Sequence, residues 1–435
     1  MTTTYDPHHP MYLDEADVRG ELTRVYDLCH GCRRCNELCS SFPTLFSYVD
    51  QHDEQDAGRM TPAQQDQVID ECLQCKLCYV NCPYTPDQHE WAIDFPRLML
   101  RADAMRHATG QLPVRRRATT NVMARTDLMG KASTRAAPLV NRMIGADAGS
   151  VTRKIIEKTS GVSAQRLIPS FTKVRFSAWF KRRPRIRIVH RQARVAVFPT
   201  CLVEYQEPAI GQDLVKVYER NGIECSITTG VGCCGAPWLH SGDVEHFTKV
   251  ATKNVAALAK TVRRGNDIVV PQPTCSYILK KDYADYVPGV DADLVAANTY
   301  DAAEYLMKVH KADGTQLDTN FTGAVPAQIT YHTPCHLRAQ NIGFKSRDLM
   351  KLTGAKVKLV QQCSGTDGMW GLRAENADLA IPMAKKLGDE IASADGDIVT
   401  GDCHLANTAI AEQTGHSPLH PLQVMARAYG IPTEG

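Results

Sequence analysis

The first 82 residues contain two copies of one cysteine pattern. The copies are Cys29, Cys32, Cys35 and Cys39, and then Cys72, Cys75, Cys78 and Cys82, with Pro83 following. In such runs the first three thiolates hold one 4Fe-4S cluster, and the fourth reaches the neighbouring cluster. The spacing therefore predicts two clusters that relay electrons singly. One would be held by Cys29, Cys32, Cys35 and Cys82, and the other by Cys72, Cys75, Cys78 and Cys39.

Zinc ribbons and disulfides are the alternative uses of paired Cys-x-x-Cys elements. Each run here has three closely spaced cysteines and a fourth, which favours iron-sulfur clusters over both. Sixteen cysteines in 435 residues are too few for a small disulfide scaffold. A cytosolic redox protein agrees with this composition.

The chain start, MTTTYDPHHPMYLDEAD, lacks the basic and apolar parts of a signal peptide. No run of 18 or more apolar residues follows, so we expect a cytoplasmic protein, either soluble or peripheral on the inner face of the cell membrane. With 435 residues, 43% of them hydrophobic, the chain can bury several cores, which predicts several domains.

The formal net charge of +2 hides two segments of opposite sign. The segment between the cysteine runs contains seven carboxylates and a single basic residue, Arg59. The carboxylates are Asp50, Asp53, Glu54, Asp56, Asp66, Asp70 and Glu71. Nine Lys or Arg and no carboxylate lie between Lys173 and Arg194. Such charge patterns suggest docking faces.

The basic segment also carries Phe176, Trp179 and Phe180, a mixture that suits an anionic membrane surface. The alternative is that these aromatic residues belong to a core and that the charges form a solvated face or dock a partner protein. The cysteine runs argue against nucleic acid as the ligand.

Helical spacing marks both sides of the cysteine runs. It predicts helices in DEADVRGELTRVYDLC and TPAQQDQVIDECLQC. In the second helix, Thr61 is the predicted N-cap, Pro62 lies in the first turn, and Gln65 lies within reach of the cap. Further on, an apolar stripe predicts a helix that Pro138 kinks or splits. The stripe consists of Val122, Met129, Ala132, Ala136, Val140 and Met143.

An internal repeat begins at residue 193. ARVAVFPTCLVEYQEP matches AQITYHTPCHLRAQN, and each segment leads through a helix and a second strand to a cysteine-glycine element. A longer helix and a third strand, DIVVPQPT or DIVTGD, complete each copy. Because strand and helix alternate, each copy should form a small parallel sheet with its cysteines at the carboxyl ends of strands.

The repeat supplies a second group of candidate metal ligands. The first copy has four thiols, Cys201, Cys233, Cys234 and Cys275, enough for one further cluster. The second copy has Cys335, Cys363 and Cys403, together with His336, His404 and nearby His332. Its site is either three thiolates with an imidazole or an open position, structural zinc, or a decayed site that only shapes a shared cleft.

Several further residues have ordinary roles. Cys225 is predicted to be a small buried hydrophobic residue, and His416 and His420 to be surface residues. Gly230, Gly232 and Gly235 spell G-x-G-x-x-G, but cysteines fill its variable positions and Pro237 follows. We interpret these glycines as room for a cluster, and we expect neither FAD nor NAD to bind this chain.

These motifs resemble those of the heterodisulfide-reductase-related iron-sulfur proteins. HTPCHLRAQNIGFKSRDLM and QQCSGTDGMWG look most like the iron-sulfur C subunits of anaerobic glycerol-3-phosphate dehydrogenases and their relatives. The resemblance implies a helical ferredoxin domain and two repeats that relay electrons between a flavoprotein and quinone at the membrane, or a diiron peroxide-reducing protein such as rubrerythrin. It also implies, for full repeats, a disulfide-cleaving cluster of five thiolates, but here Ile278, Ser364 and Ala406 stand where that pattern has cysteines.

The predicted fold class is therefore α plus α/β. We expect an all-helical two-cluster ferredoxin domain at 1–105, a basic helical connector at 106–192, a first repeat at 193–322 and a degenerate second repeat at 323–435. The predicted function is that of an electron-transfer subunit that does not turn over without its partner. The alternative is a disulfide-type reductase that acts at a cluster in the repeats.

Overall fold

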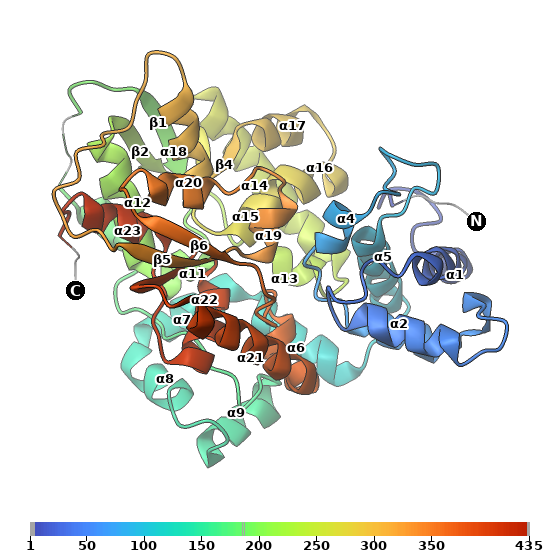
Figure 1. Ribbon diagram of the computed structural model, residues 1–435. Coiled ribbons are helices and arrows are strands. Elements are labelled where there is room, and N and C mark those ends of the chain that lie inside the picture. Colours follow the sequence, from blue (N-terminus) through green and yellow to red (C-terminus); the bar gives the residue numbers. More distant parts are fainter. Residues whose placement is uncertain (1–4, 185, 187, 433–435) are drawn as a thin grey trace.

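The computed structural model describes residues 5–184, 186 and 188–432. Residues 1–4 and Arg185 and Arg187 of the basic segment lie outside the described residues. The N-terminal helices lie at one side of the molecule, and the strands lie at the other (Figure 1). The structure thus combines a helical part with parallel sheets.

The cysteine runs lie among helices. These are α1 Glu15–Cys32, α2 Ser41–Asp50, α3 Pro62–Asp70, α4 Leu77–Asn81 and α5 Phe95–Ala108, with a 3-10 turn, η1, at Ala57–Arg59. Leu22, Tyr26, Phe42 and Leu98 are fully or almost fully buried between them. Six of the eight cysteines pack against this core, so the apolar faces of the helices hold the two runs together.

Thr61 caps α3, as predicted, by accepting a hydrogen bond from the Gln64 amide. The returning side chain is that of Gln64, whose Oε1 accepts from the Thr61 amide at 2.8 Å. The expectation for Gln65 was wrong because the third helical position, where a capping box closes, belongs to Gln64.

Each repeat forms a parallel sheet, and the two sheets share one strand order. Sheet one contains β1 Ala193–Val197, β2 Ile223–Ile227, β3 Asp267–Val270 and β4 Thr299–Asp301, in the order β2-β1-β3-β4. Sheet two contains β5 Gln328–His332, β6 Lys356–Val360 and β7 Ile398–Gly401, in the order β6-β5-β7. The order of the first three strands is therefore the same in both copies.

Helices cover both sheets. In the first copy they are α11 Cys201–Tyr205, α12 Pro208–Arg220, α13 Ala236–Leu239, α14 Val244–Arg263, α15 Pro273–Tyr277, a π-helical turn η2 at Ile278–Asp282, α16 Tyr283–Tyr286, α17 Val290–Ala297 and α18 Ala302–Lys311. In the second they are α19 Cys335–Ala339, α20 Lys345–Lys351, the 3-10 turns η3 Trp370–Leu372 and η4 Ala374–Asn376, α21 Ala377–Ala394, α22 His404–Thr414 and α23 Pro421–Ala428.

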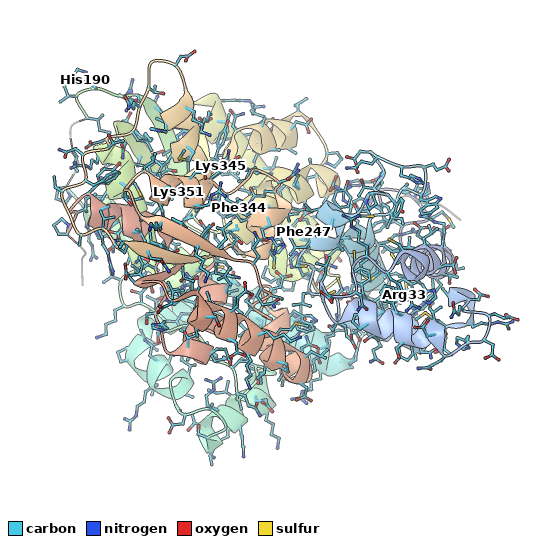
Figure 2. All side chains as sticks on the ribbon, in the orientation of Figure 1. Arg33, His190, Phe247, Phe344, Lys345 and Lys351 are labelled. Atoms are coloured by element: carbon cyan, nitrogen blue, oxygen red, sulfur yellow. The ribbon has the colours of Figure 1, made fainter. Side chains whose placement is uncertain are left out.

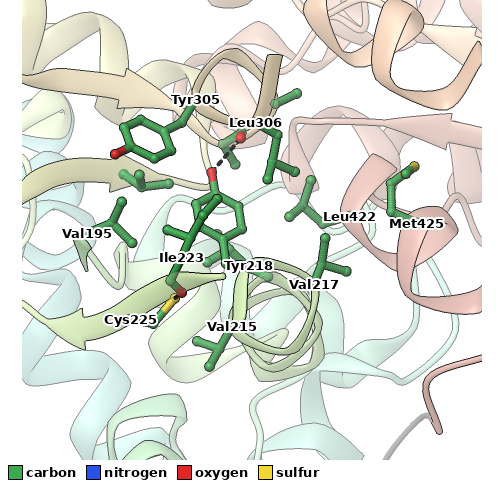
Figure 3. Packing of buried hydrophobic residues seen from close by; sticks show 14 of the residues in the cluster. Val195, Val215, Val217, Tyr218, Ile223, Cys225, Tyr305, Leu306, Leu422 and Met425 are labelled. Carbon is green, nitrogen blue, oxygen red and sulfur yellow. Dashed lines mark hydrogen bonds between the residues drawn. The ribbon is translucent and has the colours of Figure 1, made fainter. Parts of the chain in front are cut away.

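The two repeats share a hydrophobic core. Leu422 and Met425 of α23 pack in one cluster with Val217 and Tyr218 of α12 (Figure 3). The Tyr218 hydroxyl donates to the Ala302 carbonyl at 2.6 Å, which satisfies it within the core. This shared cluster of buried residues joins the two repeats. Cys225 belongs to this cluster, as predicted.

The connector forms five short helices. They are α6 Val114–Ala124, α7 Thr126–Arg135, α8 Ala137–Ile144, α9 Val151–Ser160 and α10 Phe176–Arg182. The predicted helix is split before Pro138, as expected, and again at Arg125. Its apolar stripe is not a buried face, since Val122, Met129 and Met143 are 42–43% exposed. The stripe is therefore divided among α6, α7 and α8 and does not form one continuous helix face.

The aromatic residues of the basic segment belong to the core. Phe176 is fully buried, and Trp179 and Phe180 pack against the core shared by the repeats. Arg183 pairs with Glu219 at 2.7 Å. These contacts favour the core interpretation over a membrane surface. No helix in the described part of the chain is long and apolar enough to cross a membrane.

Carboxylates of the acidic segment attach the connector to the helical part. Asp70 pairs with Arg106 at 2.7 Å and also with Arg116, and Arg116 in turn lies 3.3 Å from the buried Asp103. Asp66 pairs with Arg19 at 2.6 Å. Part of the predicted acidic docking face is therefore used within the molecule.

Candidate metal centres

The thiols of the first run gather with that of Cys82. Cys29, Cys32, Cys35 and Cys82 line one hollow, together with Phe42 and Phe46. Burial, followed by the negative charges of Cys82 and Cys32, raises the pKa of Cys35 to about 11. The fourth cysteine of the second run thus lies beside the first run.

Cys39 lies beside the second run in the same reciprocal way. Burial, and next the charge of Cys75, raises the pKa of Cys39 to about 12. Burial and then the charge of Cys39 raise the pKa of Cys72. Burial, and then the charges of Cys75, Cys72 and Cys39, raise the pKa of Cys78. The structure therefore brings together both groups of four thiols.

The four thiols of the first repeat meet beyond the carboxyl ends of its strands. Cys201 follows β1, Cys233 and Cys234 follow β2, and Cys275 lies in α15, just after β3. Hydrogen bonds from the Cys201 and Cys234 thiols hold the pKa of Cys233 well below its usual range. The Cys234 thiol donates hydrogen bonds to Cys233 and Cys275, and these bonds raise the pKa of Cys234. The parallel topology explains this convergence, because successive strands end at one edge.

Side chains outside the cysteine motifs fix the loop that carries Cys233 and Cys234. Asn254 of α14 accepts from the Gly232 amide at 2.9 Å and donates to the Cys233 carbonyl at 2.9 Å. The Tyr283 hydroxyl donates to the Cys234 carbonyl, also at 2.9 Å. Buried partners therefore hold the loop on two sides.

The connector contributes to the same loop. Asp127 of α7 accepts from the Cys233 amide at 2.9 Å through Oδ2 and from the Tyr205 hydroxyl at 3.1 Å through Oδ1. Sequence reasoning missed Asp127, Asn254 and Tyr283 because no spacing links them to the cysteines. The only signal for Asp127 is that it is a carboxylate in a strongly basic connector.

The glycines of the cysteine loops lie against protein atoms of neighbouring helices, and that they also leave room for a cluster stays a prediction. Gly235 has φ +91°, and a Cβ there would lie 2.8 Å from the ring of Phe247, which is labelled in Figure 2. At Gly232 a Cβ would meet Asp127 Oδ2 at 2.8 Å, and at Gly365 it would meet the Ala380 carbonyl at 2.4 Å. These glycines allow α14, α7 and α21 to approach the loops closely.

The second-repeat thiols lie against the second cysteine run. Cys335, Cys363 and Cys403 line one pocket, and Cys75 lines it with them. Hydrogen bonds from Cys335 to Cys363 and to Cys75 raise the pKa of Cys335 well above its usual range. Gln272 of the first repeat donates to Cys403 Sγ at 3.1 Å. This group therefore contains four thiols, one of which is also a candidate ligand of the N-terminal cluster.

The candidate histidines are buried beside this pocket. His336 Nε2 lies 3.0 Å from the Gln74 carbonyl, and its Nδ1 lies 3.1 Å from Thr274 Oγ1, so both ring nitrogens have protein partners. His332 Nε2 contacts the Gln362 carbonyl at 3.1 Å. Burial lowers the pKa of His404 to about 4. His420 was expected at the surface but is buried, with 2% of its surface exposed, and caps α23.

The donor chemistry of these groups fits iron-sulfur clusters. Each N-terminal group and the first-repeat group offers four cysteine sulfurs, the usual ligand set of such a cluster. Thr126 Oγ1, next to Asp127 at the start of α7, is buried, has no hydrogen-bond partner among the described residues and could donate to a sulfide there. Within the described residues, no three His, Cys, Asp or Glu side chains form a ready site for a single metal ion. The residues therefore fit iron-sulfur clusters by the type and number of their ligand atoms, four cysteine sulfurs in each group.

Comparison with known proteins supports this description. A family model described as "Cysteine-rich domain" matches residues 195–280 and 329–408, one match in each repeat. The chain is 26% identical over 408 residues to the C subunit of anaerobic glycerol-3-phosphate dehydrogenase from Escherichia coli strain K12, and the match covers 83% of this chain and 99% of that relative.

Two further relatives match about half of the chain. The B subunit of the fumarate reductase (CoM/CoB) of Methanothermobacter marburgensis is 28% identical over 239 residues, covering 54% of this chain and 45% of the relative. "Uncharacterized iron-sulfur protein MMP1067" of Methanococcus maripaludis is 26% identical over 221 residues, covering 50% of this chain and 40% of the relative. The chain therefore contains two matches to the cysteine-rich domain, and along most of its length it resembles the C subunit of anaerobic glycerol-3-phosphate dehydrogenase.

Proposed function

We propose that the chain is an iron-sulfur electron-transfer subunit of an oxidoreductase complex. Two 4Fe-4S clusters would be held in the N-terminal part, with Cys29, Cys32, Cys35 and Cys82 on one and Cys72, Cys75, Cys78 and Cys39 on the other. A further cluster would be held by Cys201, Cys233, Cys234 and Cys275. When bound, such clusters supply one-electron redox chemistry.

The observation that carries this proposal is the position of Cys75. Its thiol belongs to the second cysteine run and also lines the pocket of Cys335, Cys363 and Cys403. In the first cysteine run, Cys32 is exposed, whereas the other fifteen cysteines are buried or partly buried. The thiols of the N-terminal part and of the second repeat thus meet at Cys75, and this contact supports a relay between the two parts.

The partners follow from the names of the relatives and from what the chain lacks. Two relatives are named as subunits, one of a dehydrogenase and one of a reductase, and no FAD or NAD motif is present in this chain. We therefore propose a flavoprotein subunit as one redox partner. The other would be quinone, reached from a peripheral position on the membrane, or a peroxide-reducing diiron protein such as rubrerythrin.

A pull-down under anaerobic conditions tests the proposal. The tagged full chain should co-purify with a redox protein, and the chain alone should show no dehydrogenase activity. In the isolated complex, Cys335→Ala should slow electron transfer from the donor to the acceptor, because it removes the thiol that contacts Cys75. Cys225→Ala, in the hydrophobic core, is the matched control and should leave transfer unchanged. Dehydrogenase turnover by the chain alone would contradict the proposal.

A disulfide-type reductase remains the second candidate, and one observation favours it. Asp367 lines the pocket with the second-repeat thiols, its side chain is only 7% exposed, and its Oδ2 has no hydrogen-bond partner in the described residues. A buried acid beside thiols suits a reaction that takes up protons. If this candidate is right, the isolated chain should reduce an added disulfide and Cys363→Ala, which removes a thiol of the same pocket, should abolish that turnover, whereas a relay subunit would show no such activity.

A further inference from the structure

The connector helix α7 begins against the first-repeat thiols, although more than 60 residues separate it from Cys201. Its first two residues are Thr126 and Asp127, and Asp127 contacts Cys233. Asp127 Oδ2 accepts from the Cys233 amide at 2.9 Å, and Oδ1 accepts from the Tyr205 hydroxyl at 3.1 Å. A carboxylate with two oriented donors is thus fixed at the edge of the four-thiol group.

Thr126 places a hydroxyl at the same end of α7 as Asp127. Its hydroxyl oxygen is buried and has no hydrogen-bond partner in the described residues. Thr126 is the first residue of α7 and directly precedes Asp127, whose carboxylate contacts the Cys233 amide. A buried hydroxyl without a partner is costly, and a bound sulfide or thiolate would satisfy it.

Close packing fixes the position of α7. A Cβ on Gly130 would lie 2.4 Å from the ring of Tyr205, so α7 and α11 touch where no side chain separates them. Tyr205 is itself 3% exposed and donates to Asp127. The charge of Asp127 therefore cannot move away from the site without repacking.

We propose that Asp127 and Thr126 tune the first-repeat centre in opposite directions. Asp127 acts as a fixed negative charge that disfavours the reduced, more negative state, and Thr126 acts as a hydrogen-bond donor that favours it. Charge and hydrogen bonds near the sulfurs are among the factors that set the potentials of iron-sulfur centres. Both are positioning residues. The inference rests on the proposed function, because it requires a cluster at these four thiols.

A redox titration of the full chain, followed by electron paramagnetic resonance, tests the proposal. The signal that disappears in Cys234→Ser identifies the first-repeat centre. Asp127→Asn keeps the size and one acceptor oxygen of Asp127 but removes the charge, so the midpoint potential of this signal should rise. Thr126→Val removes the donor at nearly constant volume, so the potential should fall. Thr126→Ser keeps the hydroxyl and should keep the parental value.

Asp147→Asn is the control, since Asp147 is an exposed carboxylate of the same connector and its loss should leave the potential unchanged. Iron content is measured for every variant. Shifts of one sign in both variants, no shift in either, or loss of the centre from both would overturn the inference. Absence of any signal dependent on Cys234 in the parental chain would instead contradict the proposed cluster at this site, and the two failures are thus distinct.

Discussion

The fourth cysteine of each run lies beside the thiols of the other run. Cys82 shares a hollow with Cys29 and Cys35, and Cys39 lies close enough to Cys72 for its charge to raise the pKa of that thiol further, after burial. A crossed arrangement ties the two runs to one another, since each cluster would be held by residues from both. The crossing can be tested by pairs of substitutions.

We predict that two double variants retain different amounts of iron. Cys29→Ser with Cys82→Ser removes two ligands of the same cluster, so about four irons should remain on the other N-terminal cluster. Cys29→Ser with Cys39→Ser removes one ligand from each and should cost about four irons more. Iron and acid-labile sulfide per chain are the measurement. The reverse order, with more iron lost from the Cys29→Ser and Cys82→Ser pair than from the Cys29→Ser and Cys39→Ser pair, would show that the runs do not cross.

His420 carries a prediction about pH. Its ring is buried, Nδ1 accepts from the Leu422 amide at 3.1 Å, and burial lowers its pKa to about 3. An unfolded chain has a histidine pKa of about 6.5, so the unfolded state binds the proton first as the pH falls. The stabilisation is therefore fully present above about pH 6.5 and is lost progressively down to about pH 3.

His420→Asn retains the helix cap but cannot be protonated. Between pH 7 and pH 5 the parental chain should lose about 2 kcal/mol more unfolding free energy than this variant. Urea unfolding at the two pH values measures the difference. His416→Asn, at an exposed position, is the control and should behave as the parent does. A variant as sensitive to acid as the parent would show that His420 is protonated without cost in the folded state.

At the scale of elements, α7 is the connector helix on which the first-repeat site depends. Gly130 faces the Tyr205 ring of α11, and Asp127, one turn earlier, reaches the Cys233 amide. The contact between the two helices therefore sets the distance between the carboxylate and the thiols.

We predict that Gly130→Ala disturbs this site. The added Cβ would meet the Tyr205 ring at 2.4 Å, and such overpacking costs about 1–3 kcal/mol. Pushing α7 outward should also lengthen the contact between Asp127 and Cys233, so iron bound at the first repeat should decrease. Thermal unfolding and iron content are the measurements, with Lys131→Ala, at an exposed position on the same helix, as the control. Unchanged stability and iron content would mean that α7 can move freely.

At the scale of the whole molecule, the sequence predicted the parallel sheets and the thiols at their carboxyl ends. It could do so because strand, helix and cysteine recur in a fixed order in both repeats. It could not predict that Cys75 meets Cys335, since that contact joins two segments 260 residues apart in the chain. The Asp127 contact was missed for the same reason, and His420 because its burial depends on how α23 packs into the shared core.

The shared core and the Cys75 contact join the N-terminal part to the two repeats. The repeats form one body around Tyr218 and Leu422, and the second run docks onto that body through Cys75. Trp370 strengthens this junction, because its Nε1 donates to the Asp70 carbonyl at 2.8 Å. The relay we propose thus runs through a junction that is built into the fold.

The most direct test of this account is the iron and sulfide content of the full chain purified without oxygen, with its paramagnetic signal after reduction by dithionite. The two N-terminal clusters predict at least about eight irons per chain, a brown colour and signals from more than one centre, and a cluster in the first repeat would add further iron. A colourless preparation that gives no signal after dithionite would contradict the account.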